Sequence, residues 1–480
     1  MSTLAFILIL GAPVLGVVSL AVISNYRLGA GLNMLLSALA FTGALMLFAT
    51  RRVAGELLLV DSFNIYLVAL NTFIGFTTSI FSASYISYEL EKGHLTPGHL
   101  RFYHALYQAM MGAMSLALLS NNLGLMWVGI ELATLSTVVM VGIYRTPEAI
   151  EAAWKYFILG SIGIALAFFG TILLYVTAQQ VLGEGSAALT WTHLMRAAPN
   201  FNAALLSLSF VFLLAGYGTK VGLAPLHAWL PDAHAEGPTP ISAVLSGLLL
   251  NVALYALLRI KMIMAGNGGV IPSGPIMMVM GLVSLIFAAL MLYRRRDIKR
   301  LFAYSSIEHM GIITFAFGLG GPLANFAGLL HMTMHSLTKS AIFFSVGHIA
   351  QARGTQRLSR ITGLAQSNPM LALALALGVV AIAGIPPFGV FTSEFLVITT
   401  TFARQPLLAI ILAGGILLAF GALIMHLQDI LLGSPPKGEA QPVRASSLPI
   451  YIHMGLVLLA GLWLPQALTQ WFQEVARLLG

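Results

Sequence analysis

The sequence contains no cysteine, and only 8% of its 480 residues are charged. Iron–sulfur clusters and thiolate-bound nickel need cysteine ligands, so the chain cannot itself hold such a redox centre. The shortage of charge comes with 58% hydrophobic residues and a mean hydropathy of +0.91, which excludes a water-soluble domain with a polar surface. These absences indicate a polytopic membrane protein.

Apolar runs long enough to cross a hydrocarbon core of about 30 Å follow one another along the chain. Short polar or glycine- and proline-containing connections separate them, and helices are the natural spanning form at this length. We therefore predict one all-α membrane domain over residues 1–480, with about fourteen transmembrane helices. The first apolar run lacks a basic leader and a small-residue cleavage site, so we interpret it as a retained span.

The lysines and arginines of the loops predict the orientation, because basic loops stay cytoplasmic. With the N-terminus outside, the inside loops carry about twice as many of these residues as the outside loops. We therefore expect an inner (cytoplasmic) membrane protein with both termini outside. This count assigns Arg259 and Lys261 to an outside loop and leaves Lys155, Lys220 and Lys339 within helices. The net charge of +8 is scattered through the loops, so we expect no nucleic-acid partner.

Four charged residues lie inside hydrophobic stretches, namely Glu131, Lys220, Lys339 and Glu394. A charge at the middle of a bilayer costs roughly 3 kcal/mol on insertion scales, so four of them together indicate an ion or proton pathway. Glu131 has no basic residue within a helical turn, and we predict that its partner is Lys220 from another helix. Burial favours the neutral form of each group and proximity favours the charged forms, so such a pair can take up and release a proton. The alternative is a static buried ion pair, which stabilises a fold only weakly.

His331, His335 and Lys339 follow one another at a spacing of four residues, which places them on one face of a helix. A His-x-x-x-His pair can bind metal or haem, so a haem-carrying electron-transfer protein is one hypothesis. Neither a glutamate in the metalloprotease arrangement nor an obvious second histidine pair within another helix accompanies it. Imidazoles that lead toward a lysine favour proton relay, because histidine titrates near neutral pH. We therefore predict no metal or cofactor site in this chain.

Three other polar residues, His227, His234 and Lys155, have two interpretations each. His227 and His234 either extend the relay or are structural histidines. Lys155 lies near the start of the predicted sixth helix and either snorkels to the surface or joins the pathway. We interpret Asp297 and the basic run around it as an ordinary solvated loop.

An internal duplication is visible in the sequence. Lys155, Ile158, Ser161 and Gly163 recur with the same spacing as Lys339, Ile342, Ser345 and Gly347, and Gly222 with Pro225 recurs as Gly384 with Pro387. The offset is five predicted helices, an odd number, so the two copies must cross the bilayer in opposite senses. Transporters with inverted repeats place ion sites near the midplane, at interrupted helices. The predicted divisions are 1–100 for helices 1–3, 101–265 for the first repeat (helices 4–8), 270–432 for the second (helices 9–13) and 445–480 for helix 14.

Four segments carry a resemblance to a known family. They are WVGIEL at 127–132, GTKVGLAPLHAWLPDAH at 218–234, DIKRLFAYSSIEHMG at 297–311 and HMTMHSLTK at 331–339. They resemble the antiporter-like, proton-conducting subunits of respiratory complex I. The same family includes subunits of Mrp-type cation/proton antiporters and of group 4 membrane-bound hydrogenases. The resemblance runs over nearly the whole chain.

The resemblance implies a fourteen-helix subunit with two inverted five-helix repeats, broken helices 7 and 12, and a hydrophilic axis along the middle of the membrane. Glu131 and Lys220 match the helix-5 glutamate and helix-7 lysine of the family. Lys339 matches its helix-11 lysine, and Glu394 matches its helix-12 carboxylate. These are the residues that stand out from the hydrophobic pattern alone.

The chain departs from the family at one position of the axis. Asn251 stands where several members carry a lysine in the eighth helix, so water or nearby histidines would have to bridge the gap. The Glu308-His309 pair, together with Asn251, makes the chain most similar to hydrogenase-4 component F and its relatives.

We therefore predict a proton-translocating membrane subunit of a hydrogenase-4 or formate-hydrogenlyase-type complex. The chain itself is expected to carry no cofactor, with nickel–iron and iron–sulfur centres on a peripheral redox module. Other membrane subunits of the same complex are further expected partners. The alternatives are an Mrp-type sodium/proton antiporter subunit and an antiporter-like subunit of complex I.

Overall fold

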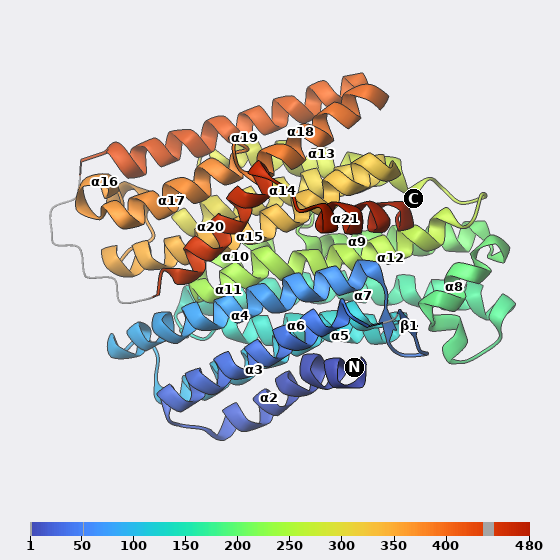
Figure 1. Ribbon diagram of the computed structural model, residues 1–480, viewed down its shortest axis with the longest axis horizontal. Helices are drawn as coiled ribbons and strands as arrows, with labels where there is room; N and C mark the ends of the chain where they lie inside the picture. The colour runs from blue at the N-terminus through green and yellow to red at the C-terminus, as the bar shows by residue number, and fades with distance from the viewer. Residues whose placement is uncertain (1, 51, 435–445) are drawn as a thin grey trace.

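The computed structural model describes residues 2–50, 52–434 and 446–480. Long helices lie side by side, and both ends of the chain lie in the right-hand half of the view in Figure 1. The helices of the N-terminal part are α1 (Ser2–Phe6), α2 (Ala12–Val22), α3 (Tyr26–Leu47), α4 (Ser62–Glu91), α5 (Pro97–Leu119), α6 (Leu123–Val141), α7 (Pro147–Leu182), α8 (Trp191–Ala197), α9 (Ala203–Val221), α10 (Trp229–Glu236), α11 (Thr239–Val244) and α12 (Leu250–Ala265). Two π-helical turns, η1 (Ile7–Gly11) and η4 (Leu245–Leu249), join α1 to α2 and α11 to α12.

The C-terminal part of the chain is also helical. Its helices are α13 (Ser273–Leu292), α14 (Ile298–Leu319), α15 (Gly321–Arg353), α16 (Leu364–Ser367), α17 (Pro369–Ile382), α18 (Gly389–Arg404), α19 (Pro406–Leu432), α20 (Leu448–Leu462) and α21 (Gln466–Leu478). Short 3-10 turns occur at η2 (Ser186–Leu189), η3 (Ala198–Asn200) and η5 (Leu358–Arg360). The strands β1 (Val53–Ala54) and β2 (Leu59–Val60) pair antiparallel in the connection before α4.

Within the described ranges, nine helices are long and apolar enough to cross a membrane, or ten if the bent pair α20 and α21 forms one span. The all-α, multi-pass membrane fold is therefore confirmed, while the count of about fourteen spans stays a prediction. Helices α14 and α15 have 22 and 33 residues but fail this test of composition. They fail because charged, histidine and serine side chains interrupt their apolar sequences.

Central and peripheral helices bury different shares of their surface. The most apolar window of Thr239–Ala265 is 100% buried, whereas that of Pro406–Leu432 is only 33% buried inside the protein. A helix that presents an apolar surface to the outside is what a hydrocarbon environment requires. The segments α11, α12, α14 and α15 therefore form the interior, and it is there that the polar side chains gather.

Two helices break where the sequence predicts interruptions. Helix α9 ends at Val221, and Gly222 follows it with a φ of 80°, in the left-handed region that glycine adopts without strain. Helix α17 ends at Ile382, and Gly384 takes a φ of 68° before α18 begins. The side chain of Glu394 fills the space beside Gly384, because a Cβ there would lie 2.0 Å from its Oε2. Each break thus lies near a residue of the predicted axis, Lys220 two residues before Gly222 and Glu394 beside Gly384.

The C-terminal helix α21 is bent by 81° from α20 and packs back onto the protein. Trp471 Nε1 donates to the Ser62 carbonyl at 2.8 Å, and Asn325 Nδ2 donates to the Gly480 carbonyl at 2.7 Å. Phe472 and Val475 are buried, so α21 places its apolar side inward. Trp471 thus attaches α21 to the start of α4, and Gly480 lies at the start of α15.

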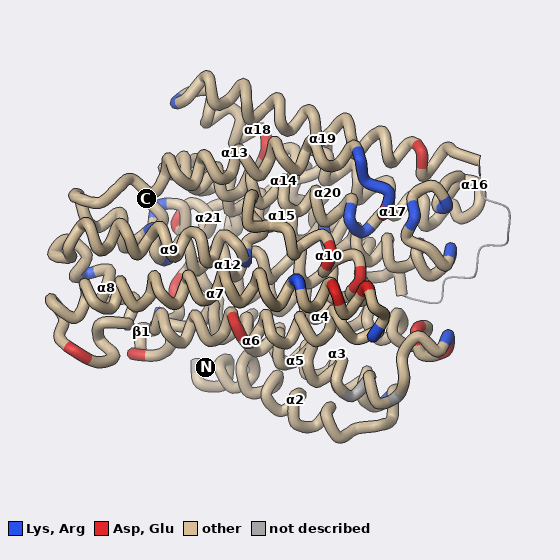
Figure 2. The backbone as a smooth tube through the Cα atoms, turned by 180° about the vertical axis from the view of Figure 1, so that it is seen from behind, with Lys and Arg blue, Asp and Glu red and all other residues tan. Residues whose placement is uncertain are grey.

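Basic residues gather on the side of the molecule away from the C-terminus (Figure 2). The connection between α13 and α14 contains Arg294, Arg295 and Arg296, and η5 with the residue before it contains Arg357 and Arg360. The Leu358 N–H of η5 donates to the Arg296 carbonyl at 2.9 Å, so these two basic segments lie side by side. The orientation of the chain in a membrane stays a prediction, and this distribution agrees with the positive-inside pattern on which it rests.

Candidate functional site

Glu131 and Lys220 lie together although they come from different helices, α6 and α9. Lys220 Nζ lies 3.3 Å from Glu131 Oε2 and donates to Thr134 Oγ1 at 2.9 Å. The lysine side chain is 1% exposed and the glutamate 17%. Gly160 of α7 leaves room for the ammonium, because a Cβ at this position would lie 3.1 Å from Nζ. We call Glu131 and Lys220 the first-half pair.

Six polar residues of α14, α15 and α18 form a second group, which we call the second-half cluster. Its members are Glu308, His309, His331, His335, Lys339 and Glu394, and all six residues are buried. Among the four predicted axis residues, Lys339 and Glu394 therefore belong to this cluster, and Glu131 and Lys220 form the first-half pair.

Imidazoles connect the three helices of the second-half cluster. The ring nitrogens His309 Nδ1 and His331 Nε2 lie 3.0 Å apart, and His331 Nδ1 lies 2.8 Å from Ser393 Oγ. His309 Nδ1 is also 3.9 Å from Glu394 Oε1. The ring centroids of His309 and His335 are 5.5 Å apart. Both histidines of the His-x-x-x-His spacing therefore face His309 of a neighbouring helix.

Lys339 is fully buried on α15, and its ammonium donates to the Phe302 carbonyl at 3.0 Å. Within the described parts of the chain the structure gives it no ion pair, although Glu308 lies close enough to interact with it electrostatically. A cation that lacks a directly bonded carboxylate is costly to keep charged in a dry interior. Lys339 therefore differs from Lys220 in how its charge is balanced.

Asn251 and His234 both contact residues of α15, the helix that carries Lys339. Asn251 Nδ2 donates to Ser336 Oγ of α15 at 2.7 Å and to the Gly247 carbonyl at 3.0 Å. His234 is fully buried, stacks on Phe343 with a centroid distance of 4.9 Å, and interacts electrostatically with Lys339. Neither ring nitrogen of His234 has a hydrogen-bond partner among the described residues. The buried side chain of His227 contacts the ring of Phe287 at a centroid distance of 4.6 Å.

Lys155 lies outside this buried set. Its side chain is 47% exposed, and its Nζ lies 2.6 Å from Glu151 and 3.1 Å from Asp232. Arg300 also contacts Asp232 at 2.7 Å, so the three groups form a surface network that joins α7, α10 and α14. This geometry agrees with the snorkelling interpretation of Lys155.

The expectation that Arg259 and Lys261 lie in an outside loop is wrong, because both lie in α12 and are buried. Arg259 belongs to α12 and is 1% exposed, and its guanidinium binds Asp61 through two hydrogen bonds of 2.7 and 2.9 Å. The ring of Trp191 faces it at 4.4 Å, and Tyr255 accepts a further bond from its Nε. Burial of Asp61 opposes its ionisation, but the attached guanidinium outweighs this effect and holds its pKa below the usual range. A hydropathy pattern ends the helix at Arg259, because this is the first charge of the segment. It gives no sign of the partner Asp61, which is far away in the sequence.

The interpretation of the basic run around Asp297 as a solvated loop is also wrong, because Lys299 is buried. Lys299 is 2% exposed, and its ammonium donates to the carbonyls of Ala235 and Gly237 at 3.2 and 2.6 Å. It thereby satisfies carbonyl groups at the end of α10. Asp297 accepts from the Arg300 N–H at 2.9 Å as the N-cap of α14, and burial raises its pKa.

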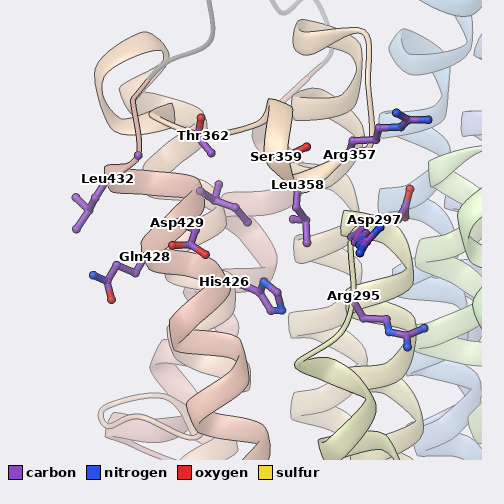
Figure 3. A pocket seen from close by; sticks show the side chains of 13 residues that line it. Arg295, Asp297, Arg357, Leu358, Ser359, Thr362, His426, Gln428, Asp429 and Leu432 are labelled. Carbon is purple, nitrogen blue, oxygen red and sulfur yellow. The ribbon is translucent and has the colours of Figure 1, made fainter.

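A cavity of about 1110 Å³ lies apart from these residues, between α19 and the connections around η5 (Figure 3). His426 and Asp429 line it from α19, whereas the labelled side chains of Arg295 and Arg357 point away from that helix. None of the predicted axis residues is among its lining residues. We therefore place the candidate site in the buried polar interior and not in this cavity.

One group of residues in the described parts of the chain has donor atoms close enough to share a metal ion. It consists of His309, His331 and Glu394, whose ligand atoms all lie within 4.8 Å of one another. The sequence pattern suggested only His331 and His335, because the spacing within one helix does not show a contact with another helix.

The fold and the buried charges define a multi-pass, antiporter-like membrane subunit. Residues 120–420 match the family model described as "NADH:quinone oxidoreductase/Mrp antiporter, TM". The chain is 58% identical over 467 residues to the hydrogenase-4 component F homolog of Methylacidiphilum infernorum (isolate V4), covering 97% of this chain and 98% of that protein. The chain therefore belongs to the NADH:quinone oxidoreductase/Mrp antiporter family, as the resemblance of its motifs suggested.

Two solved structures share the fold. One is a chain of the membrane-bound sulfane sulfur reductase, an archaeal respiratory membrane complex, with a TM-score of 0.89 and 22% identity, covering 100% of this chain and 98% of that one. The other is a chain of the Mrp complex from Dietzia sp. DQ12-45-1b, with a TM-score of 0.84 and 19% identity, covering 99% and 97%. At these identities the likeness shows the fold alone. The chain is an antiporter-like membrane subunit of the kind found in hydrogenase-4 and complex I-related complexes.

Proposed function

We propose that this chain moves protons across the membrane as a subunit of a hydrogenase-4 or formate-hydrogenlyase-type complex. The pathway runs from the first-half pair, past His234 and Asn251, to the second-half cluster. The observation that carries the proposal is the pairing of Glu131 with Lys220, two charges from different helices in the interior of a membrane protein. The 58% identity to a hydrogenase-4 component F homolog favours this type of complex.

The two ends of the pathway have complementary chemistry. Lys220 holds its proton most firmly when Glu131 is near, because the opposite charge stabilises the ammonium. Movement of Glu131 away from Lys220 weakens this stabilisation and releases the proton. Lys339, His309 and His331 then pass it on to Glu394, since each imidazole can accept a proton on one nitrogen and donate from the other.

In the proposed cycle, a proton from the inside first reaches Lys220. It then moves along the histidines and Lys339 toward Glu394, and leaves to the outside as Glu131 reassociates with Lys220. The chain has no cysteine to hold an iron–sulfur cluster, so the driving reaction belongs to metal centres of partner subunits. The basic end of the molecule is assigned to the cytoplasmic side, and both termini to the outside.

The test is Glu131→Gln, which keeps the size of the side chain and removes its charge. Inside-out vesicles that contain the intact complex are given hydrogen as electron donor, and a pH-sensitive dye reports acidification of the lumen. We expect proton uptake to fall at least tenfold per electron transferred. Glu184→Gln is the matched control, because Glu184 lies exposed after α7 and outside the pathway. An unchanged proton-to-electron ratio in Glu131→Gln would remove the first step of the proposal.

Sodium/proton antiport is the second candidate, because the fold also matches a chain of an Mrp complex. The same vesicles discriminate between the two functions. Proton uptake that requires hydrogen and is unchanged when sodium is replaced by choline supports the redox-driven function. Sodium-dependent proton movement without an electron donor supports antiport.

Gentle purification from native membranes tests the partners. Nickel and iron in the purified material, together with subunits that carry cysteine-ligated clusters, are the expected result. Recovery of small membrane subunits alone, without these metals, would assign the chain to a complex without a redox module.

A further inference from the structure

Two histidines and a carboxylate converge in the second-half cluster from three different helices. His309 comes from α14, His331 from α15 and Glu394 from α18. Their ligand atoms all lie within 4.8 Å of one another, and all three residues are buried. Imidazole nitrogen with carboxylate oxygen is a donor set that Zn²⁺ and other divalent first-row metals prefer.

We propose that His309, His331 and Glu394 form a binding site for one divalent transition-metal ion, of which Zn²⁺ is the best match. Four-coordinate zinc with bonds of about 2.0–2.2 Å holds its ligand atoms roughly 3.3–3.5 Å apart. His309 Nδ1 and His331 Nε2 are already 3.0 Å apart, and His309 Nδ1 is 3.9 Å from Glu394 Oε1. Side-chain shifts of about 1 Å would therefore complete the geometry.

Residues next to the three ligands can orient them, add a further ligand and balance the charge of the ion. Ser393 Oγ lies 2.8 Å from His331 Nδ1, the nitrogen that does not face the ion, and so orients the ring. Both nitrogens of His335 and the Oε2 atom of Glu308 lack hydrogen-bond partners among the described residues. His335, next to His309, offers a fourth ligand and a third nitrogen, and the carboxylates of Glu308 and Glu394 supply the negative charge that the ion requires.

A metal ion would reach the site from the side of Glu394. Its side chain is 7% exposed, whereas that of His309 is 1% exposed. Glu394 also lies beside the break between α17 and α18, where Pro386 and Pro387 are exposed. The site is therefore closed on the histidine side and slightly open on the carboxylate side.

Occupancy has a consequence that rests on the proposed function. The ion takes the lone pairs of His309 and His331 through which a proton would pass, so it blocks the relay. We expect micromolar Zn²⁺ to inhibit redox-driven proton uptake in vesicles. We expect the inhibition to weaken at least tenfold in Glu394→Gln, relative to the residual uptake of that variant.

The binding test does not depend on transport. The full-length chain in detergent is freed of metals with a chelator and titrated with Co²⁺, whose visible d–d absorption reports a tetrahedral site. We expect one Co²⁺ per chain, displaced by Zn²⁺, and at least tenfold weaker binding in His331→Gln. His104→Gln is the control, because His104 is a buried histidine like His331 but lies on α5, and neither of its nitrogens has a hydrogen-bond partner among the described residues. Equal binding in His331→Gln and the unchanged protein would overturn the proposal.

A second variant guards against misfolding as the cause of lost binding. His331→Cys keeps a metal ligand and adds a thiolate, so a bound Co²⁺ should gain a strong sulfur-to-metal charge-transfer band in the near ultraviolet. Absence of this band in a folded variant contradicts the site. Binding of Co²⁺ without inhibition of transport supports the site and contradicts a pathway through it, whereas absence of transport in the unchanged protein leaves the binding result intact.

Discussion

The first-half pair and the second-half cluster keep charge in the interior by different means. Lys220 contacts a carboxylate at 3.3 Å and a hydroxyl at 2.9 Å, and its partner Glu131 remains 17% exposed. Among the described residues, Lys339 donates one hydrogen bond, to the Phe302 carbonyl at 3.0 Å, and Glu308 interacts with it at a longer range. Around it lie imidazoles that are hydrogen-bonded to one another across helices.

This difference separates two tasks in the proposed pathway. A proton that leaves Lys220 must do so against the attraction of a nearby carboxylate, so the pair controls when the proton moves. In the second-half cluster the proposed path runs through imidazoles that already contact one another, His309 with His331 and His335. The pair is therefore suited to gating and the cluster to conduction.

The strongest test exchanges each lysine for methionine. Lys220→Met leaves Glu131 without its partner, and breaking a buried pair costs about 3–5 kcal/mol, toward the lower end here because Glu131 is partly exposed. Lys339→Met removes a buried cation that has no ion pair among the described residues, so we expect stability to change by less than about 1 kcal/mol or to rise. Both variants should lose redox-driven proton uptake in vesicles.

Denaturant unfolding in detergent and dye quenching in vesicles measure the two effects separately. The double variant Glu131→Gln with Lys220→Met should regain most of the lost stability without regaining transport. Equal destabilisation by Lys220→Met and Lys339→Met would contradict the contrast between the two regions.

The Asp61–Arg259 pair keeps charge in the interior in a third way, because further contacts hold both partners in place. Arg259→Met leaves a buried carboxylate and should cost about 3 kcal/mol. Since the pKa of Asp61 is lowered in the folded protein, its pairing contributes fully above the unfolded value of about 3.9 and is lost as the pH falls below it. The thermal midpoint of the unchanged protein should therefore drop as the pH falls below about 4. Asp61→Asn should flatten this drop, and an identical acid profile in Asp61→Asn would exclude Asp61 as its source.

Hydrophobic patterning predicted the class of fold and drew attention to Glu131, Lys220, Lys339 and Glu394. It did so because charges stand out against apolar sequence. The same signal failed at Arg259 and Lys299, which a hydropathy pattern takes for the ends of helices. Their burial depends on partners that are distant in sequence or on another helix, Asp61 for the arginine and the carbonyls after α10 for the lysine.

The histidines show a related limit of prediction from the sequence. Spacing within α15 indicated that His331 and His335 share a face, and they do face the same neighbour, His309. The hydrogen bond and the candidate metal site, however, join different helices. Such pairs depend on how helices pack against one another, and the residue spacing within one helix does not predict this packing.

Asn251→Leu tests the connection between the two regions. It removes the hydrogen bond to Ser336 Oγ at 2.7 Å and leaves a buried hydroxyl with one partner fewer, at a cost of about 1–2 kcal/mol. The substitution also replaces a polar side chain of the proposed pathway by an apolar one, so we expect proton uptake to fall by a moderate factor while electron transfer continues. Asn325→Leu is the control, because Asn325 bonds only to backbone near the C-terminus in the described structure. A normal proton-to-electron ratio in Asn251→Leu would show that the pathway bypasses it.

The smallest expected effect is that of Lys155→Ala, although Lys155 corresponds to Lys339 in the predicted internal duplication. Lys155 is 47% exposed and bound to Glu151 and Asp232, and exposed ion pairs contribute about 0–1 kcal/mol. Arg300 keeps Asp232 paired in its absence. We expect unfolding and proton uptake in Lys155→Ala to stay close to those of the unchanged protein, whereas its counterpart Lys339→Met stops transport. A loss of proton uptake in Lys155→Ala equal to that in Lys339→Met would mean that sequence equivalence in the repeat, and not burial, decides which lysine conducts.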